Sequence, residues 1–253
     1  MDEDDFCYLF DTFGHVVLPN VLGADELATL NAAVDRHLDD DAGWFEYLYE
    51  DGTTGYAPAD RATPLAGSMG YSIGKDAPSM LSWPEPRDRD PFRKLMHHPE
   101  LCRSMNALCG RGFRLDHPPS LRIYNPRPAG AAVSDDAPLN LHGSSGPDFN
   151  PHEYYVVRNG RMHSGLTVVA WQLADIGPGD GGFGLIPGSH KGNFPCPPAM
   201  RRGEAFREHV HQPVCKAGDC VIFTEALTHT TLPWRGEHQR RSLLVRYAPA
   251  NLA

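Results

Sequence analysis

Beyond Gly110, short segments of strand-forming residues alternate with turn-forming residues, and this pattern constrains the fold most. Gly and Pro number 25 and 23 among 253 residues, well above their average combined share of roughly 12%. So many turns favour short strands over a helical bundle, and the pattern predicts a sandwich or jelly roll. The expected strands are 119–125, 138–142, 153–157, 165–174, 183–186, 209–214, 219–224, 227–232 and 241–247.

The first 110 residues have a different pattern, in which apolar residues recur at helical spacing in two segments. Residues 13–18 predict a strand, and apolar residues at helical spacing predict a helix over 24–38. Residues 90–109 predict a second helix, which Pro99 is placed to divide. The polar, Gly- and Pro-rich stretch 40–90 is expected to be irregular and to cap a site. We therefore expect an α+β, mainly β, single domain over 1–253, in which 1–110 supports and caps a core formed by 111–253.

Charge and composition exclude several classes of protein. The net charge of −9 disfavours a nucleic-acid partner, because phosphate binding needs clustered Lys and Arg. No apolar run approaches the roughly 20 residues of a membrane span, and the acidic start MDEDDFCYLF is unlike a signal peptide. The six cysteines are scattered without a C-x-x-C pair. We expect a cytoplasmic protein with reduced thiols and no membrane partner.

Two segments carry the candidate chemistry. Residues 163–194 run from a long strand through a Gly-rich turn into Pro187-Gly188-Ser189-His190, and residues 218–247 run from a strand to His229 and a basic strand. With the opening GHVVLPNVLGADELATL, this order resembles the phytanoyl-CoA dioxygenase family of non-haem iron, 2-oxoglutarate-dependent oxygenases over about residues 10–250. The resemblance implies a double-stranded β-helix (a cupin-like jelly roll) with N-terminal helices packed on it, and Fe(II), 2-oxoglutarate and O2 as cofactors.

The resemblance also implies a ligand set. The family pattern is H-x-D/E, a distal His and then an Arg, which places the metal ligands at His142 and His229 and the Arg at Arg241, or at Arg240. A guanidinium suits the far carboxylate of 2-oxoglutarate, because it is planar, bidentate and always charged. Leu243 and Val245 share the strand face of Arg241, and these apolar neighbours favour Arg241 as the inward residue.

One position departs from the family pattern. Ser144 stands where the carboxylate ligand is expected, and a neutral hydroxyl is a poor ligand for Fe(II). Three explanations stay open: Asp148 closes the metal triad; an exogenous chloride occupies the third position, as in the iron halogenases; or the site has lost its metal.

Weaker candidates surround these residues on neighbouring strands and on the loop 143–163. Asn140, Tyr124 and Trp171 are expected to contact the cofactor. Ser144, Tyr154, Tyr155 and Trp234 are expected to line a substrate or anion pocket.

The resemblance implies an enzyme that oxidises an unactivated C–H bond of a small molecule, by hydroxylation or a related oxidation, releasing succinate and CO2. One alternative is a halogenase with chloride at the iron beside Ser144, and another is a non-catalytic cupin-like binding module. A zinc hydrolase is disfavoured, since H-x-x-x-H and H-E-x-x-H are both absent.

Overall fold

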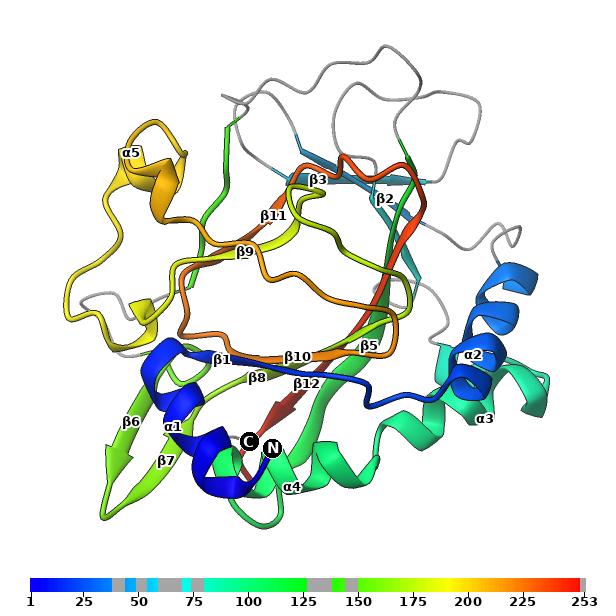
Figure 1. Ribbon diagram of the computed structural model, residues 1–253, viewed down its shortest axis with the longest axis horizontal. Coiled ribbons are helices and arrows are strands. Elements are labelled where there is room, and N and C mark those ends of the chain that lie inside the picture. Colours follow the sequence, from blue (N-terminus) through cyan, green and yellow to red (C-terminus); the bar gives the residue numbers. More distant parts are fainter. Residues whose placement is uncertain are drawn as a thin grey trace.

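The computed structural model describes residues 1–37, 44–48, 54–58, 70–73, 80–126, 138–143 and 150–250. Helices flank an antiparallel sheet in this part of the chain (Figure 1). The helices are α1 (Glu3–Phe13), α2 (Ala24–His37), α3 (Pro86–Leu95), α4 (Pro99–Cys109) and α5 (Pro198–Arg201). Within these ranges, no helix is both long enough and apolar enough to cross a membrane.

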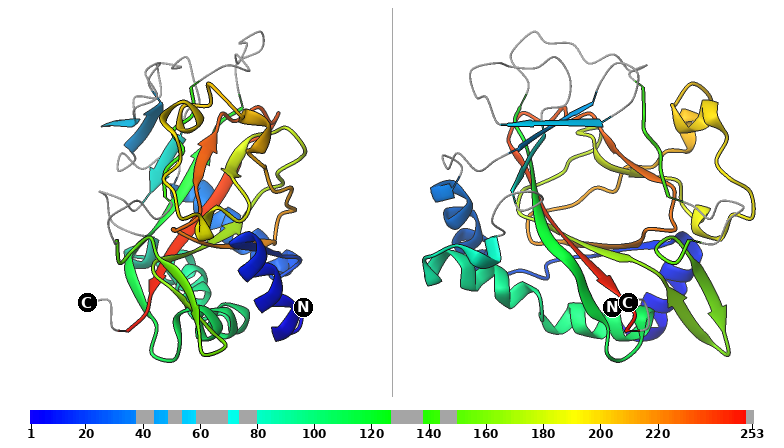
Figure 2. Two further views of the ribbon diagram at one scale, coloured as in Figure 1. Left: turned by 90° about the vertical axis from the view of Figure 1, so that its left-hand side faces the viewer. Right: turned by 180° about the vertical axis from the view of Figure 1, so that it is seen from behind.

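Within the described ranges, eight strands form the large sheet, in the order β1-β10-β8-β12-β5-β4-β2-β3. Its strands are β1 (His15–Leu18), β2 (Trp44–Leu48), β3 (Thr54–Pro58), β4 (Gly70–Ile73), β5 (Arg114–Tyr124), β8 (Thr167–Gln172), β10 (Cys220–Thr224) and β12 (Arg240–Ala248). Two small sheets pair β9 (Gly182–Leu185) with β11 (His229–Leu232), and β6 (Tyr155–Arg158) with β7 (Arg161–Ser164). The β9–β11 pair lies across from β8, β10 and β12, and helices cover the other side of these strands (Figures 1 and 2).

The predicted boundary between an N-terminal cap and a β core is wrong, because strands from before residue 110 join the large sheet. β1 pairs with β10 at one edge, and β4 pairs with β5 to continue the sheet into β2 and β3. The predicted irregular stretch 40–90 therefore contains three strands. Its mixed polar and aromatic sequence hid them, since no regular alternation marks a buried face.

Helix α1 was not predicted, yet its sequence contains both end signals. The Asp2 side chain accepts a hydrogen bond from the Asp5 backbone N–H at 2.8 Å, which caps the helix start. Gly14 ends the helix with φ 76°, and its N–H donates to Phe10 O at 2.7 Å. A Cβ at Gly14 would lie 2.5 Å from His190 Nδ1, so only glycine fits here. Phe10, fully buried, packs the helix onto the core.

The large sheet has two faces of opposite character. On β12, Leu243 and Val245 are fully buried in the apolar core shared with Trp171 and the helices. Arg240 and Arg246 project from the other face, because alternate residues of a strand point to opposite sides. The apolar face thus packs against the helices, and the polar face lines the cavity described below.

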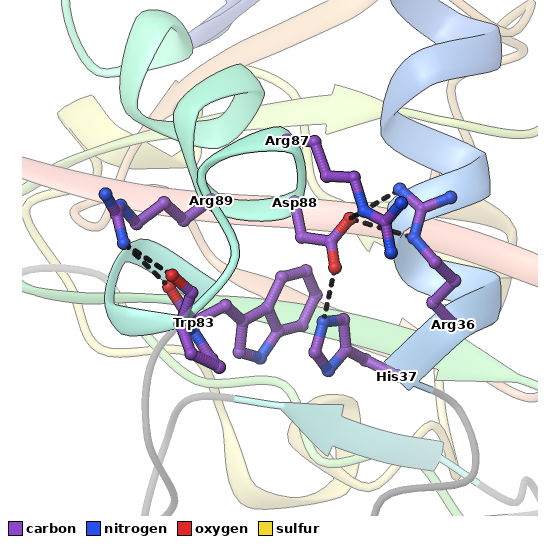
Figure 3. A network of polar contacts seen from close by, with 7 residues as sticks. Arg36, His37, Trp83, Arg87, Asp88 and Arg89 are labelled. Carbon is purple, nitrogen blue, oxygen red and sulfur yellow. Dashed lines mark hydrogen bonds and ion pairs between the residues drawn. The ribbon is translucent and has the colours of Figure 1, made fainter.

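A polar network joins α2 to α3 (Figure 3). The buried Asp88 carboxylate accepts hydrogen bonds from Arg36 Nε at 2.8 Å and His37 Nε2 at 3.1 Å. The His37 ring stacks on Trp83 with 3.8 Å between centroids. Burial would raise the pKa of Asp88, but the hydrogen bonds from Arg36 and His37 outweigh it and lower the pKa below its ordinary value of 3.8.

Replacement of Asp88 by Asn is expected to lower the free energy of unfolding by about 2 kcal/mol at pH 7, because charge-assisted hydrogen bonds are lost. The folded pKa is depressed, so this stabilisation is present above pH 3.8 and is lost as the pH falls below it. Urea unfolding at pH 7 and at acid pH should show the difference from wild type shrinking in acid. Asp90→Asn, on a half-exposed carboxylate, is the control; an equal loss in both variants would contradict the prediction.

Candidate metal and cosubstrate site

Two histidines meet on adjacent pieces of extended chain. His142 N–H donates to His229 O at 2.9 Å, and His229 N–H donates to His142 O at 2.8 Å. The two imidazole centroids are 4.3 Å apart. His142 precedes the segment that was expected to hold the third ligand, and His229 begins β11. The structure therefore brings together the two residues predicted as metal ligands.

Backbone carbonyls fix which nitrogen of each ring is available. Nδ1 of His142 lies 2.9 Å from Asn140 O, and Nδ1 of His229 lies 2.6 Å from Leu227 O. A carbonyl only accepts, so Nδ1 carries the proton in each neutral ring and Nε2 keeps its lone pair. Burial, with the charge of His142 acting in the same direction, lowers the pKa of His229 to about 4. At neutral pH the His229 ring is thus neutral, and its Nε2 lone pair can bind a metal ion.

Both rings line a cavity of about 330 Å³ on the inner side of the large sheet. Its walls combine amide and hydroxyl groups, two phenylalanine rings and three arginines. These lining residues are Arg122, Asn140, His142, Ala170, Gln172, Phe183, Phe223, His229, Thr230, Thr231, Arg240, Leu244 and Arg246. Three guanidinium groups beside two imidazoles make a cavity suited to an anionic ligand.

Of the two adjacent candidates, Arg240 lines this cavity and Arg241 does not. Arg240 is 5% exposed, and its Cζ lies 5.1 Å from the Tyr124 ring centroid. Arg241 points to α2, where it donates to the side chain of Asn31 at 2.9 Å and pairs with Asp35. The predicted inward orientation of Arg241 is therefore wrong: the apolar residues that share its face belong to the helix-covered side of the sheet.

Glu225 lies beside the histidine pair and was missed by the sequence reasoning. Its Oε2 is 3.4 Å from His229 Nε2, and its Oε1 accepts from Arg246 Nε at 2.9 Å. Burial would raise the pKa of Glu225, but the neighbouring His229 and Arg246 lower it below its ordinary value. The available signal was the spacing E-x-x-x-H across the turn that joins β10 to β11.

The turn Pro187-Gly188-Ser189-His190 supports the strand that carries His229. Ser189 Oγ accepts from Thr228 N–H at 2.8 Å, directly before His229. His190 Nε2 donates to Asp11 O at 3.1 Å, so its ring holds α1 rather than a metal. Gly143 follows His142 with φ 80°, and a Cβ there would lie 2.5 Å from Leu227 O and 2.6 Å from Glu225 O. Close backbone approach thus requires glycine beside the first histidine.

The other predicted contact residues divide into two groups. Asn140 lines the cavity, and Tyr124 lies against Arg240. Trp171 is buried against His98 of the helix side, and Tyr155 donates to Asp11 of α1 at 2.7 Å, so neither prediction of a site contact holds. Trp234 is buried with its indole donating to His238 O at 2.8 Å; neither it nor Tyr154 lines the cavity. Ser144 and Asp148 lie outside the described residues.

A larger cavity, of about 890 Å³, lies between α1, α4 and the β6–β7 hairpin. Cys7 and Cys109 contribute to its wall, and burial raises the pKa of both thiols, which lowers the share of reactive thiolate. In the described ranges, no three His, Cys, Asp or Glu side chains already converge as a complete metal site. The histidine pair is therefore the structural basis for the candidate site.

Comparisons with known proteins agree with this architecture. The chain resembles, in fold, HygX from Streptomyces hygroscopicus solved with nickel and 2-oxoglutarate bound (20% identity, TM-score 0.70, covering 99% of this chain and 88% of that one). It is also similar to AviO1 from Streptomyces viridochromogenes Tue57 (18%, 0.64, 99% and 96%) and to the α-ketoglutarate-dependent epimerase SnoN of nogalamycin biosynthesis (19%, 0.63, 98% and 85%).

Curated protein sequences give no match. The family model described as phytanoyl-CoA dioxygenase (PhyH) matches residues 10–242, which is most of the chain. The sequence resemblance to this family is confirmed: the chain belongs to the phytanoyl-CoA dioxygenase (PhyH) family.

Proposed function

We infer that this protein is an Fe(II)- and 2-oxoglutarate-dependent enzyme that oxidises a C–H bond of a small molecule. The observation that carries the proposal is the meeting of three groups in one cavity: the imidazoles of His142 and His229 and the guanidinium of Arg240. Two imidazoles on one side are the nitrogen part of the facial site of non-haem iron oxygenases. We also infer that the large sheet and the β9–β11 pair form the two walls of a jelly roll.

The residues present fit these cofactors. Both Nε2 atoms keep a lone pair because both Nδ1 atoms donate to carbonyls, and such outer hydrogen bonds orient metal-bound histidines. Arg240 lies on β12, lines the same cavity as the histidine pair, and is packed on Tyr124. A buried, oriented guanidinium binds a carboxylate through two parallel hydrogen bonds. Phe183 and Phe223 flank His229 with apolar rings and limit water near it.

Bound iron with 2-oxoglutarate and O2 supplies the oxidation, with succinate and CO2 as by-products. The chain's own residues then have separate tasks. His142 and His229 bind the metal, and Arg240 fixes the far carboxylate of the cosubstrate, with Asn140 and Gln172 as further hydrogen-bonding groups on the cavity wall.

Hydroxylation is the proposed outcome, and halogenation is the second candidate because Ser144 replaces the usual carboxylate. A small-molecule substrate is supported by the fold relatives: HygX was solved with hygromycin B bound, and SnoN with nogalamycin RO.

The test is anaerobic. Fe(II) and 2-oxoglutarate are added to metal-free protein, the visible charge-transfer band of the chelate is recorded, and chloride is then titrated. We expect a band that is unchanged by chloride. Absence of a band would overturn the enzyme proposal in favour of a binding module. A band that chloride shifts, with tighter 2-oxoglutarate binding, would favour the halogenase.

A further inference from the structure

Glu225 lies on the turn between β10 and β11, four residues before His229. Its side chain is only 14% exposed, so its carboxylate is held inside the protein. Its backbone is fixed on two sides: the N–H donates to Leu166 O at 2.9 Å, and its carbonyl packs against Gly143. Gly143 is the residue that follows His142. Glu225 therefore contacts both segments that carry the histidine pair.

The distance from Glu225 Oε2 to His229 Nε2, 3.4 Å, fits two atoms that share one metal ion. Protein oxygen and nitrogen ligands lie about 2.1 Å from such an ion, so two of them are about 3.0 Å apart at a right angle and about 3.4 Å at a tetrahedral angle. His229 Nδ1 donates to Leu227 O, so Nε2 is the ring nitrogen that is directed to Glu225 Oε2.

Arg246 binds the other oxygen of the same carboxylate. Its Nε donates to Oε1 at 2.9 Å, which orients the group and leaves Oε2 directed to His229. Hydrogen-bonded carboxylate ligands of this kind are usual at metal centres. The cavity lining contributes histidines and arginines but no Asp or Glu from the described residues. Glu225 is the carboxylate that the described chain places against His229.

We propose that Glu225 supplies the carboxylate that position 144 lacks, so that His142, His229 and Glu225 together bind the metal. The proposal rests on the function proposed above. It requires a rotation of the Glu225 side chain that brings Oε2 onto the ion held by both imidazoles. With three protein ligands, the site has no vacancy that chloride must fill, and neither an acid at Asp148 nor an exogenous anion is needed.

The proposal is tested by metal binding, without turnover. Co(II) is titrated anaerobically into the metal-free full-length protein and followed by calorimetry and by its visible spectrum, which reports the ligand set. Glu225→Gln retains size and an acceptor for Arg246 but removes the anionic ligand. We expect Co(II) affinity to fall by at least about 100-fold, since hydrogen-bonding partners of ligands alone account for 10- to 100-fold, and the spectrum to change.

Matched variants separate a ligand from a structural ion-pair partner. Glu208→Gln, on an exposed glutamate, and Asp148→Asn should both retain wild-type affinity within about twofold. Glu225→Asp, which keeps a carboxylate, should retain most of the affinity and provides the test if Glu225→Gln folds poorly. Glu225→Ala should make the Co(II)–2-oxoglutarate spectrum sensitive to chloride, because it opens a coordination position.

Three results would overturn the proposal. Unchanged affinity and spectrum in Glu225→Gln would restrict Glu225 to its ion pair with Arg246. Loss of affinity in Asp148→Asn would assign the ligand to Asp148, with the enzyme proposal intact. Failure of the wild-type protein to bind Co(II) or Fe(II) would remove the proposed function together with this inference.

Discussion

His229→Ala is expected to abolish Fe(II)-dependent turnover of 2-oxoglutarate and to weaken Fe(II) binding by at least about 100-fold. His229 is 6% exposed and Leu227 O fixes its orientation, so the substitution removes a buried, preoriented nitrogen from the proposed metal site. Anaerobic metal titration measures the affinity, and succinate formation measures turnover.

His209→Ala is the matched control, because His209 is exposed and distant from the cavity lining. The control should bind metal and turn over cosubstrate like the wild type. Circular dichroism should show both variants folded, since the backbone hydrogen bonds between residues 142 and 229 do not involve the imidazole. Turnover in His229→Ala comparable with that of the control would contradict the assignment of His229 as a ligand.

Arg240→Gln is expected to raise the KM for 2-oxoglutarate by roughly 100-fold, while Arg241→Gln changes it by less than about threefold. Removing one member of a buried charge pair costs about 2–5 kcal/mol, and Arg240 is the buried member that lines the cavity. Arg241 instead joins β12 to Asn31 and Asp35 of α2, so its loss should cost about 1 kcal/mol of unfolding free energy.

The comparison is informative because the two residues are adjacent and chemically identical. Steady-state kinetics gives the KM for the cosubstrate, and urea unfolding gives the stability of each variant. A larger KM effect in Arg241→Gln than in Arg240→Gln would reverse the assignment made from the structure. Arg240→Lys keeps the charge but not the fork geometry, and should lie between wild type and Arg240→Gln.

The sequence correctly predicted helices where apolar residues recur at helical spacing or where a proline marks a helix start. The helix expected over 24–38 is α2, and Pro99 begins a new helix, as expected of a residue that lacks an N–H. β2, β3 and β4 were missed because no alternation distinguishes their faces and because β5, which joins them to the rest of the sheet, is distant in sequence. The strand expected at 138–142 is reduced to a bridge between His142 and His229, and the N–H groups of Leu139 and Leu141 donate to the end of α5 instead of to a strand.

The family spacing predicted His142 and His229. The choice between Arg240 and Arg241 depended on which face of the strand lines the cavity, and the sequence predicted the opposite face from the one observed. The apolar neighbours of Arg241 predict that its face of the strand lines the interior of the barrel. Leu243 and Val245 are indeed buried, but against helices, and the polar inner face carries Arg240 and Arg246. Alternation alone separates the faces of a strand and does not say which face is covered by helices. Glu225 was missed because the short spacing E-x-x-x-H is a weak signal on its own and its second partner, Arg246, is identified only in three dimensions.

The reciprocal backbone hydrogen bonds between His142 and His229 have a consequence for assembly of the metal centre. The backbone pairing itself holds the two imidazoles next to each other, because both amide–carbonyl hydrogen bonds are made by main-chain atoms. The entropy of bringing two distant parts of the polypeptide together is therefore lost during folding and not during metal uptake. We therefore expect metal binding at the proposed site to be a local event on a folded scaffold, without a cycle of unfolding.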